Sequence, residues 1–204
     1  MPLNADVRYA FLSEENGHPA TIELREFGFW LYIMSDLVIF SMLFATFAVL
    51  GHSYADGPTA KDLFHLPYTF VETMFLLISS LTCGMAMAHM HRNERNRVLL
   101  WLGITFLFGM GFIVMEVSEF RHMILDGNGP SRSGFLSAFF TLVSTHGLHV
   151  TVGLLWMAVM MGNIVAKGLS EAVQSRLIRF SVFWHFLDIV WVGVFTMAYL
   201  TRAL

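Results

Sequence analysis

The sequence contains five long stretches in which apolar residues run almost without interruption. They cover residues 27–50, 67–91, 97–120, 134–166 and 177–200. A helix needs about 20 apolar residues to cross the hydrocarbon core of a bilayer, and each stretch reaches that length. Because an apolar segment in lipid must satisfy its own backbone hydrogen bonds, we predict an all-α fold. The expected architecture is a polytopic membrane protein, built as a bundle of five transmembrane helices.

Composition argues against the main alternative, a soluble protein with a large core. Hydrophobic residues make up 56% of the 204-residue chain, and charged residues only 13%. Soluble domains usually carry about 25% charged residues. The net charge of −3 and the lack of a basic tract give no sign of nucleic-acid binding. The single cysteine, Cys83, excludes a disulfide framework and, within this chain, a cysteine-built copper pair or iron–sulfur cluster.

The polar segments between the apolar stretches define the organisation of the chain. Turn signals occur at residues 56–58 (DGP) and 126–130 (DGNGP). The short charged connection 91–97 makes the second and third helices antiparallel neighbours. Residues 1–26 lack the pattern of a cleavable signal peptide, so we expect a cytoplasmic tail whose end can form a surface helix. Residues 27–204 are predicted to form one transmembrane domain, without a repeat or a linker.

Basic residues near the helix ends predict the orientation of the chain. The side with the N-terminus carries seven of them: Arg25, Arg92, Arg95, Arg97, Lys167, Arg176 and Arg179. The opposite side carries four: Lys61, Arg121, Arg132 and Arg202. Because lysine and arginine favour the cytoplasmic side of a membrane protein, we expect a cytoplasmic N-terminus and, after five spans, a C-terminus on the outer face.

Ionisable side chains inside the spans are the candidate functional residues, because such groups are costly in a membrane. One acid lies in the cytoplasmic half of the first span and another near the outer end of the second. The third span has two acids near its outer end. The fourth span has two mid-membrane histidines, and the fifth has a histidine and an aspartate. The full set is Asp36, Glu72, Glu116, Glu119, His146, His149, His185 and Asp188.

Three interpretations of these residues remain open from the residues themselves. The histidines of the fourth and fifth spans are candidate ligands for a metal or a haem, although no further ligands lie on matching helices. The acids and histidines together are candidates for a proton or ion relay. The third interpretation is structural: buried polar groups satisfy one another and determine the packing. It predicts pairs within one helix, His185 with Asp188 and Glu119 with His122, three residues apart.

Small and polar residues on two spans also predict close helix packing. A stripe on the second span is expected to let a neighbouring helix approach closely; it consists of Ser80, Gly84 and Ala88. A second stripe runs along the fourth span and consists of Ser137, Thr141, Thr145, His149 and Gly153.

Three motifs resemble subunit III of the haem-copper oxidases. Residues 145–150 (THGLHV), followed by Gly153, are similar to the HGLHV segment of that family. Residues 183–191 (FWHFLDIVW) are similar to its WHF-x-D-x-VW segment, and residues 118–120 (SEF) match its SE-aromatic motif. The motifs occur in the order of the family and on the corresponding helices. The resemblance extends from about residue 27 to the C-terminus.

This resemblance implies an accessory role. Subunit III of this family contains no haem or copper, packs against the catalytic subunit I, binds phospholipid between its helix bundles and supports proton uptake. We therefore expect no catalytic, cofactor-binding or metal-binding residue in this chain. Haem, copper and ubiquinol are expected in the partners, which are subunits I, II and IV. Asp36 matches the position of a carbodiimide-reactive glutamate in mitochondrial-type relatives, and its side chain is one methylene shorter.

The number of spans helps to choose between the subfamilies. Mitochondrial-type subunits have seven spans, and this chain lacks the first two of that set. The five-span form resembles subunit III of bacterial cytochrome bo-type ubiquinol oxidases, as do residues 27–30 (FGFW) and 129–140 (GPSRSGFLSAFF). We expect a subunit of a proton-pumping terminal ubiquinol oxidase in the bacterial inner membrane. The alternatives are subunit III of a cytochrome c oxidase, the accessory protein of nitric oxide reductase and, in a different class, an independent membrane transporter.

Overall fold

The computed structural model describes residues 19–51, 53 and 66–200. The chain falls into two compact units, Met1–Val38 and Ile39–Leu204, and each is described by itself. The boundary between them lies within the first helix, α2 (Pro19–Leu50). Because α2 begins before residue 26, the predicted end of the tail lies inside a helix, and residues 1–18 lie outside the described residues. The single transmembrane domain over residues 27–204 stays a prediction.

Four more long helices make up most of the second unit. They are α4 (Leu66–His91), α5 (Arg95–Leu125), α6 (Gly134–Lys167) and α7 (Glu171–Val194), and α7 continues into the π-helical turn η1 (Phe195–Leu200). No strand occurs in the part of the chain that the structure describes. With α2, five helices are long and apolar enough to cross a membrane, which confirms the predicted fold class.

Besides α2, two helices extend well beyond their predicted spans. Helix α5 covers 31 residues rather than residues 97–120, and α7 begins at Glu171 rather than at residue 177. The prediction ended each helix where charged residues appear. A 31-residue helix is about 46 Å long, however, and the hydrocarbon core is only about 30 Å thick. The helical turns outside the predicted spans therefore contain the charged residues, and these turns fit the headgroup layers.

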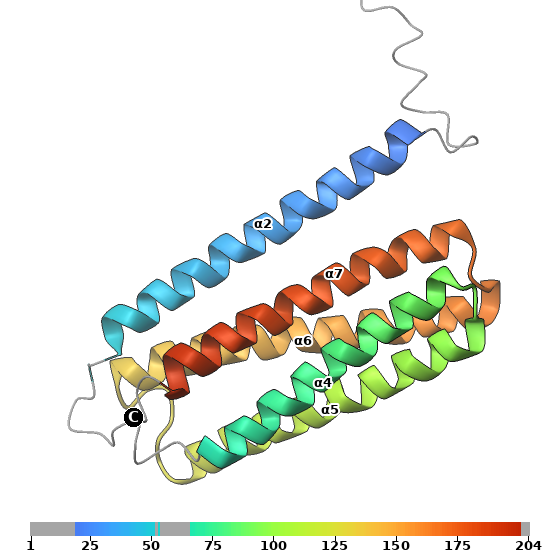
Figure 1. Cartoon of the computed structure of the whole chain (residues 1–204). Helices are drawn as coiled ribbons and strands as arrows, with labels where there is room; N and C mark the ends of the chain where they lie inside the picture. Colours follow the sequence, from blue (N-terminus) through green and yellow to red (C-terminus); the bar gives the residue numbers. More distant parts are fainter. Residues whose placement is uncertain (1–18, 52, 54–65, 201–204) are drawn as a thin grey trace, which may run out of the picture. The chain divides into compact units, whose positions relative to one another are not determined.

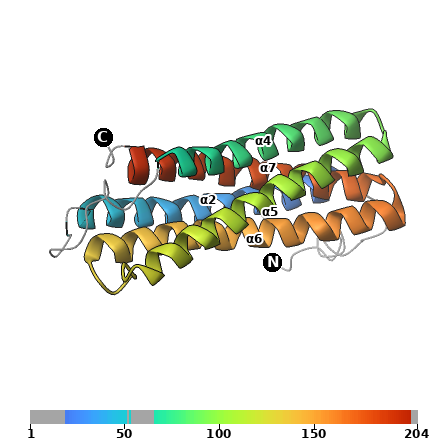
Figure 2. The same cartoon turned by 90° about the horizontal axis from the view of Figure 1, so that it is seen from below.

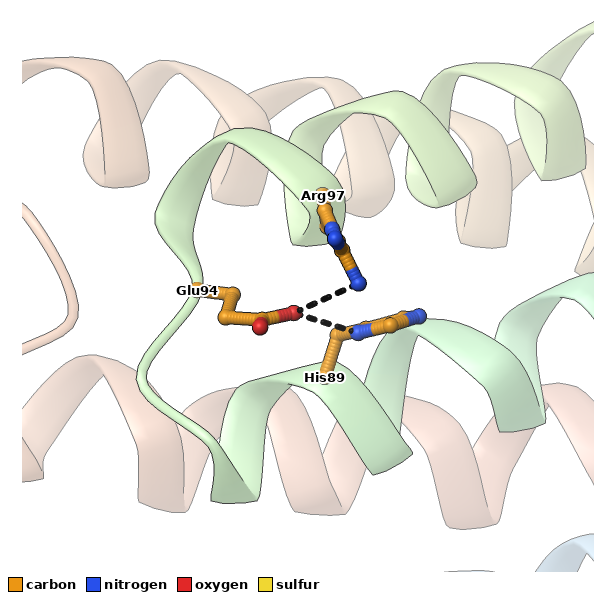
Figure 3. A network of polar contacts seen from close by, with 3 residues as sticks. All are labelled: His89, Glu94 and Arg97. Carbon is orange, nitrogen blue, oxygen red and sulfur yellow. Dashed lines mark hydrogen bonds and ion pairs between the residues drawn. The ribbon is translucent and has the colours of Figure 1, made fainter.

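The connection between α4 and α5 is a tight turn, as predicted. Asn93 has a left-handed backbone conformation (φ 59°), which asparagine adopts more readily than most residues. Glu94 fastens the turn, because its Oε2 atom lies 2.7 Å from His89 Nδ1 and 3.4 Å from Arg97 Nη1 (Figure 3). The two helices therefore run antiparallel and side by side (Figure 1).

Local capping explains where α6 begins and ends. The Ser133 hydroxyl accepts a hydrogen bond from the backbone N–H of Leu136 at 3.2 Å, as expected for an N-cap. At the other end Gly168 has a φ of 70°, and its N–H donates to the carbonyl of Ile164. Only glycine adopts this left-handed conformation without strain, so the turn into α7 depends on this residue.

Helices α4 to α7 form a closed ring in which each helix contacts two others. Helix α4 lies against α5 and α7, and α6 lies against the same two helices; Figures 1 and 2 show this arrangement from two sides. Aromatic rings fill the centre, where Phe112 meets Trp191 edge to face with ring centroids 4.7 Å apart. The segment 39–50 of α2 also joins this unit, because Phe47 packs against Phe135 with ring centroids 5.8 Å apart.

The outward faces of these helices are apolar. Leu107, Leu155 and Ile189, on three different helices, are 69%, 65% and 72% exposed. Large apolar surfaces of this kind are unusual on soluble monomers. They fit an acyl-chain environment. Glu72, Glu116 and His146 are buried inside the unit, whereas hydroxyl residues such as Thr141 and Ser144 are exposed.

Candidate functional site: the buried polar groups

Three glutamates gather where α4 and α5 approach η1. Glu72 is completely buried, and neither oxygen of its carboxyl has a hydrogen-bond partner among the residues that the structure describes. Glu116 is 3% exposed. Glu119, one turn later, accepts a hydrogen bond from the Tyr199 hydroxyl at 3.3 Å. The sequence prediction that the three acids share one end of the bundle is therefore confirmed.

Glu116 explains the glycine of the THGLHV motif. A Cβ atom on Gly147 would lie 2.5 Å from Glu116 Oε1 and 2.8 Å from Oε2. The carboxyl group of α5 therefore occupies the space that any other side chain of α6 would need. Sequence reasoning missed this contact, because Gly147 and Glu116 lie on different helices and 31 positions apart.

The predicted pair of Glu119 with His122 is wrong. Glu119 bonds to Tyr199, and His122 Nε2 instead lies 3.5 Å from Asp126 Oδ2, four residues further along the same helix. The spacing alone did not distinguish these partners, because positions three and four residues away both lie on the same helix face. The hydrogen-bond partner of Glu119 is Tyr199, which lies in η1 on a different part of the chain.

His146 lies in an aromatic enclosure at the centre of the ring. The side chain is completely buried, and its ring centroid lies 5.0 Å from Trp191, 5.9 Å from Phe112 and 6.3 Å from Phe40. Neither ring nitrogen has a hydrogen-bond partner within the described part of the chain. His146 therefore packs among aromatic rings of α2, α5 and α7.

His149 lies one turn further on but has a different environment. Its Nδ1 atom lies 2.7 Å from the Thr145 carbonyl of its own helix, and its ring packs against Phe40 at 5.2 Å. The hydroxyls of Thr141 and Thr145 likewise donate to carbonyls four residues earlier. The polar stripe of α6 thus hydrogen-bonds along its own helix. Over the described residues, no group of three or more His, Cys, Asp or Glu side chains is placed to hold a metal ion.

Ser80 joins the two ionisable residues of α7. Its Oγ atom lies 2.6 Å from His185 Nδ1, and it also hydrogen-bonds to the Asp188 side chain. The prediction placed His185 and Asp188 on one face correctly but paired them with each other. Instead, the hydroxyl of α4 lies between them and ties both to the neighbouring helix.

Other hydroxyls of α4 serve the tryptophans of α7 in the same way. The Nε1–H groups of Trp184 and Trp191 donate to Ser79 Oγ and Thr73 Oγ1, each at 3.1 Å. Sequence reasoning did not select Thr73 or Ser79. One feature of the sequence could have indicated these pairs: one span has several hydroxyl residues, and another has two tryptophans. Tryptophan N–H groups need hydrogen-bond partners when they are buried.

Close helix approaches occur at Gly153 of the predicted stripe on α6 and at Gly109 of α5, and not at Gly84 of α4. A Cβ added to Gly84 would meet no atom within 4 Å, and Ala88 is exposed, so among the described residues the predicted stripe meets α7 at Ser80 and not at Gly84 or Ala88. Gly109 and Gly153 lie against the Trp184 ring, which is 3.0 Å from the position of an added Cβ on either glycine. A tryptophan ring fits between α5 and α6 because both helices lack a side chain there.

Asp36 lies in the other unit of the chain. It follows Tyr32 by one helical turn, and the side chains of the two residues are hydrogen-bonded. The remaining candidates form three sets in the second unit: the glutamates, His146 with His149, and His185 with Asp188. The hydrogen bonds described above lie within a helix or tie one set to a neighbouring helix, and none of them joins two sets. The relay stays a prediction, whereas the contacts that tie one helix to another are observed.

Comparison with known proteins agrees with the geometry. The chain matches the family described as cytochrome c oxidase subunit III over residues 12–202. It is 56% identical to the cytochrome bo(3) ubiquinol oxidase subunit 3 of Pseudomonas aeruginosa, over 87% of this chain and 85% of that protein. It is 41% identical to the quinol oxidase subunit 3 of Bacillus subtilis, with 88% of each chain covered. The cytochrome c oxidase subunit 3 of Bacillus sp. (strain PS3) is 43% identical over 85% of this chain and 84% of its own.

These matches extend over nearly the whole described bundle, including the three motifs on α5, α6 and α7. The helical architecture, the apolar exterior and the interhelical polar contacts all fit the same assignment. The chain belongs to the cytochrome c oxidase subunit III family.

Proposed function

We propose that this chain is the non-catalytic subunit III of a proton-pumping terminal ubiquinol oxidase. The observation that carries the proposal is the 56% identity to a ubiquinol oxidase subunit 3 over 87% of the chain. The contacts of the bundle support it, because Ser80, Thr73 and Ser79 use their hydroxyls to join helices. The role is to support the assembly, lipid binding and proton uptake of a catalytic neighbour.

The proposed partners hold the redox chemistry. Subunit I is the main contact, and subunits II and IV belong to the same complex. Haem, copper and ubiquinol belong to these partners, and this chain contributes a phospholipid-binding surface. The protein lies in the bacterial inner membrane with its N-terminus in the cytoplasm, as the bias of arginine and lysine residues favours.

A cytochrome c oxidase is the second candidate complex. The 43% identity to the cytochrome c oxidase subunit 3 of Bacillus sp. (strain PS3) favours it. The electron donor is selected by the partner subunits, so the contacts within this chain suit either complex. The higher identity to the Pseudomonas aeruginosa relative makes ubiquinol our choice.

Oxygen uptake by the tagged, purified complex separates the two donors. We expect rapid oxygen consumption with reduced ubiquinol and none with reduced cytochrome c. Oxidation of cytochrome c alone would contradict the ubiquinol proposal and leave the family assignment intact. The transporter alternative is tested with the isolated chain in liposomes: substrate or ion flux above that of empty liposomes would contradict the accessory role.

A further inference from the structure

Three polar side chains meet on the seam between α4 and α7. Ser80 Oγ lies 2.6 Å from His185 Nδ1 and also hydrogen-bonds to the Asp188 side chain. The two membrane spans cover residues 67–91 and 171–199, so Ser80 and His185 lie at or beside the midpoint of each span. These three residues, called here the seam cluster, are therefore close to the middle of the bilayer.

The hydrogen bonds within the seam cluster leave two atoms unsatisfied. A carboxylate only accepts hydrogen bonds, so the single hydroxyl proton of Ser80 is donated to Asp188. Ser80 Oγ then accepts from the Nδ1–H of His185. Asp188 Oδ1 has no partner among the described residues, and no second hydrogen bond reaches His185 from that part of the chain. Because Nδ1 carries the proton, Nε2 of a neutral imidazole is an acceptor too.

The seam cluster lies on an outward face of the bundle. His185 and Asp188 are each partly exposed. Leu81 and Ile189, the next residues along the two helices, are 69% and 72% exposed. A Cβ added to Gly84, one turn further along α4, would meet no atom within 4 Å. The surface beside the unsatisfied acceptors is therefore apolar and open to an approaching helix.

The depth of the seam cluster limits what covers it. Acyl chains offer no hydrogen bond, and ionisable side chains that face them in the middle of a bilayer are costly. Phospholipid headgroups lie about 15 Å away, which is half the thickness of the hydrocarbon core. A transmembrane helix reaches this depth, and polar side chains on such helices form hydrogen bonds that stabilise helix association.

The identity of the free atoms argues against a second copy of this chain. A symmetric pair brings the same surface patch of both copies together. The seam cluster of a second copy would therefore place acceptors opposite acceptors. A different polypeptide that supplies a donor fits the two free atoms better.

We propose that the seam cluster is the docking site for a transmembrane helix of another subunit of the oxidase, which donates a hydrogen bond to Asp188 Oδ1. Leu81 and Ile189 pack against apolar side chains of that helix, and Gly84 allows its close approach. The inference rests on the proposed function, because it takes the partner from the same complex. It adds the face of this chain that meets the partner and the atom that is recognised.

The first test replaces Leu81 or Ile189 with photoreactive benzoylphenylalanine in the otherwise wild-type complex. We expect illumination to produce a crosslink to an apolar, membrane-spanning peptide of another subunit, identified by mass spectrometry. A sample without such a crosslink would overturn the proposal, whether it contains lipid adducts, a second copy of this chain, an internal crosslink or no product. Haem-bearing partners in that sample would show that the proposed function survives, whereas their absence would contradict the proposed function itself.

The second test measures how much the free acceptor contributes to assembly. Asp188→Leu removes it, and one interhelical hydrogen bond in a membrane changes association about 3- to 30-fold. We expect the apparent Kd of this subunit for the complex, measured by native mass spectrometry at graded detergent concentrations, to rise by such a factor. Thr151→Val is the matched control, because this hydroxyl of α6 donates to the Gly147 carbonyl of its own helix. An apparent Kd within twofold of wild type for Asp188→Leu would overturn the proposal.

Discussion

Individual contacts explain why particular residue types occur inside the membrane. Gly147 leaves room for the Glu116 carboxyl group of α5, which lies where a side chain at this position would be. Ser80 is required because two ionisable groups of α7 share its hydroxyl. Asp36 differs from both, since its observed partner, Tyr32, lies on its own helix. The first two residues are expected to affect stability, whereas Asp36 is the candidate for a role in activity.

Replacing Gly147 with alanine tests the contact with Glu116. An added Cβ would lie 2.5 Å from Glu116 Oε1, and overpacking of this kind costs about 1–3 kcal/mol. We expect a lower thermal midpoint for the purified complex, measured by the release of this subunit on heating. Gly162→Ala is the control, because nothing lies within 4 Å of its added Cβ. An unchanged midpoint for Gly147→Ala would show that the Glu116 carboxyl group is not held in this position.

Replacing Asp36 with asparagine tests the proposed support of proton uptake. The substitution keeps the size and removes the ionisable group. We expect lower turnover, or faster inactivation during turnover, with the subunit retained in the complex. Asp36→Glu, which restores the acid, is expected to recover most of the activity. Loss of the subunit from the membrane in the asparagine variant would instead assign Asp36 a packing role.

At the scale of helices, the pattern of apolar residues predicted much of the architecture, but it did not predict the contacts. All five spans were found because each exceeds the length that a bilayer requires. The ends of α5 and α7 were missed because polar helical turns extend beyond the hydrocarbon core. The partner of His185 was missed because helical spacing reveals neighbours within one helix, whereas Ser80 lies 105 positions earlier.

The contact between α4 and α7 is expected to depend on Ser80. Ser80→Ala leaves His185 and Asp188 without their shared hydroxyl, and an unsatisfied buried polar group costs about 1–3 kcal/mol. We expect the subunit to dissociate from the complex at a lower temperature or detergent concentration. Ser144→Ala, at an exposed position of α6, is the matched control. Equal behaviour of the two variants would mean that the hydrogen bonds of Ser80 do not stabilise the bundle.

At the scale of the whole molecule, the proposed role of this chain is to support a redox neighbour. Its buried hydroxyls and tryptophans form hydrogen bonds between helices, and we propose that the prosthetic groups belong to the partners. Sequence motifs identified the family, because they lie on the helices that build the core. They did not reveal that the α4–α5 and α6–α7 turns meet, because the hydrogen bond from Arg95 to the Val165 carbonyl joins residues 70 positions apart.

The most direct measurement is a haem spectrum of the tagged chain, before and after separation from its partners. We predict that the material purified through the tagged chain in mild detergent includes its partners and shows the haem absorption bands of an oxidase complex. After dissociation, the haem should remain entirely with the other polypeptides. Haem bound stoichiometrically to the isolated chain would contradict the proposed role, as would purification of the chain without any haem-bearing partner.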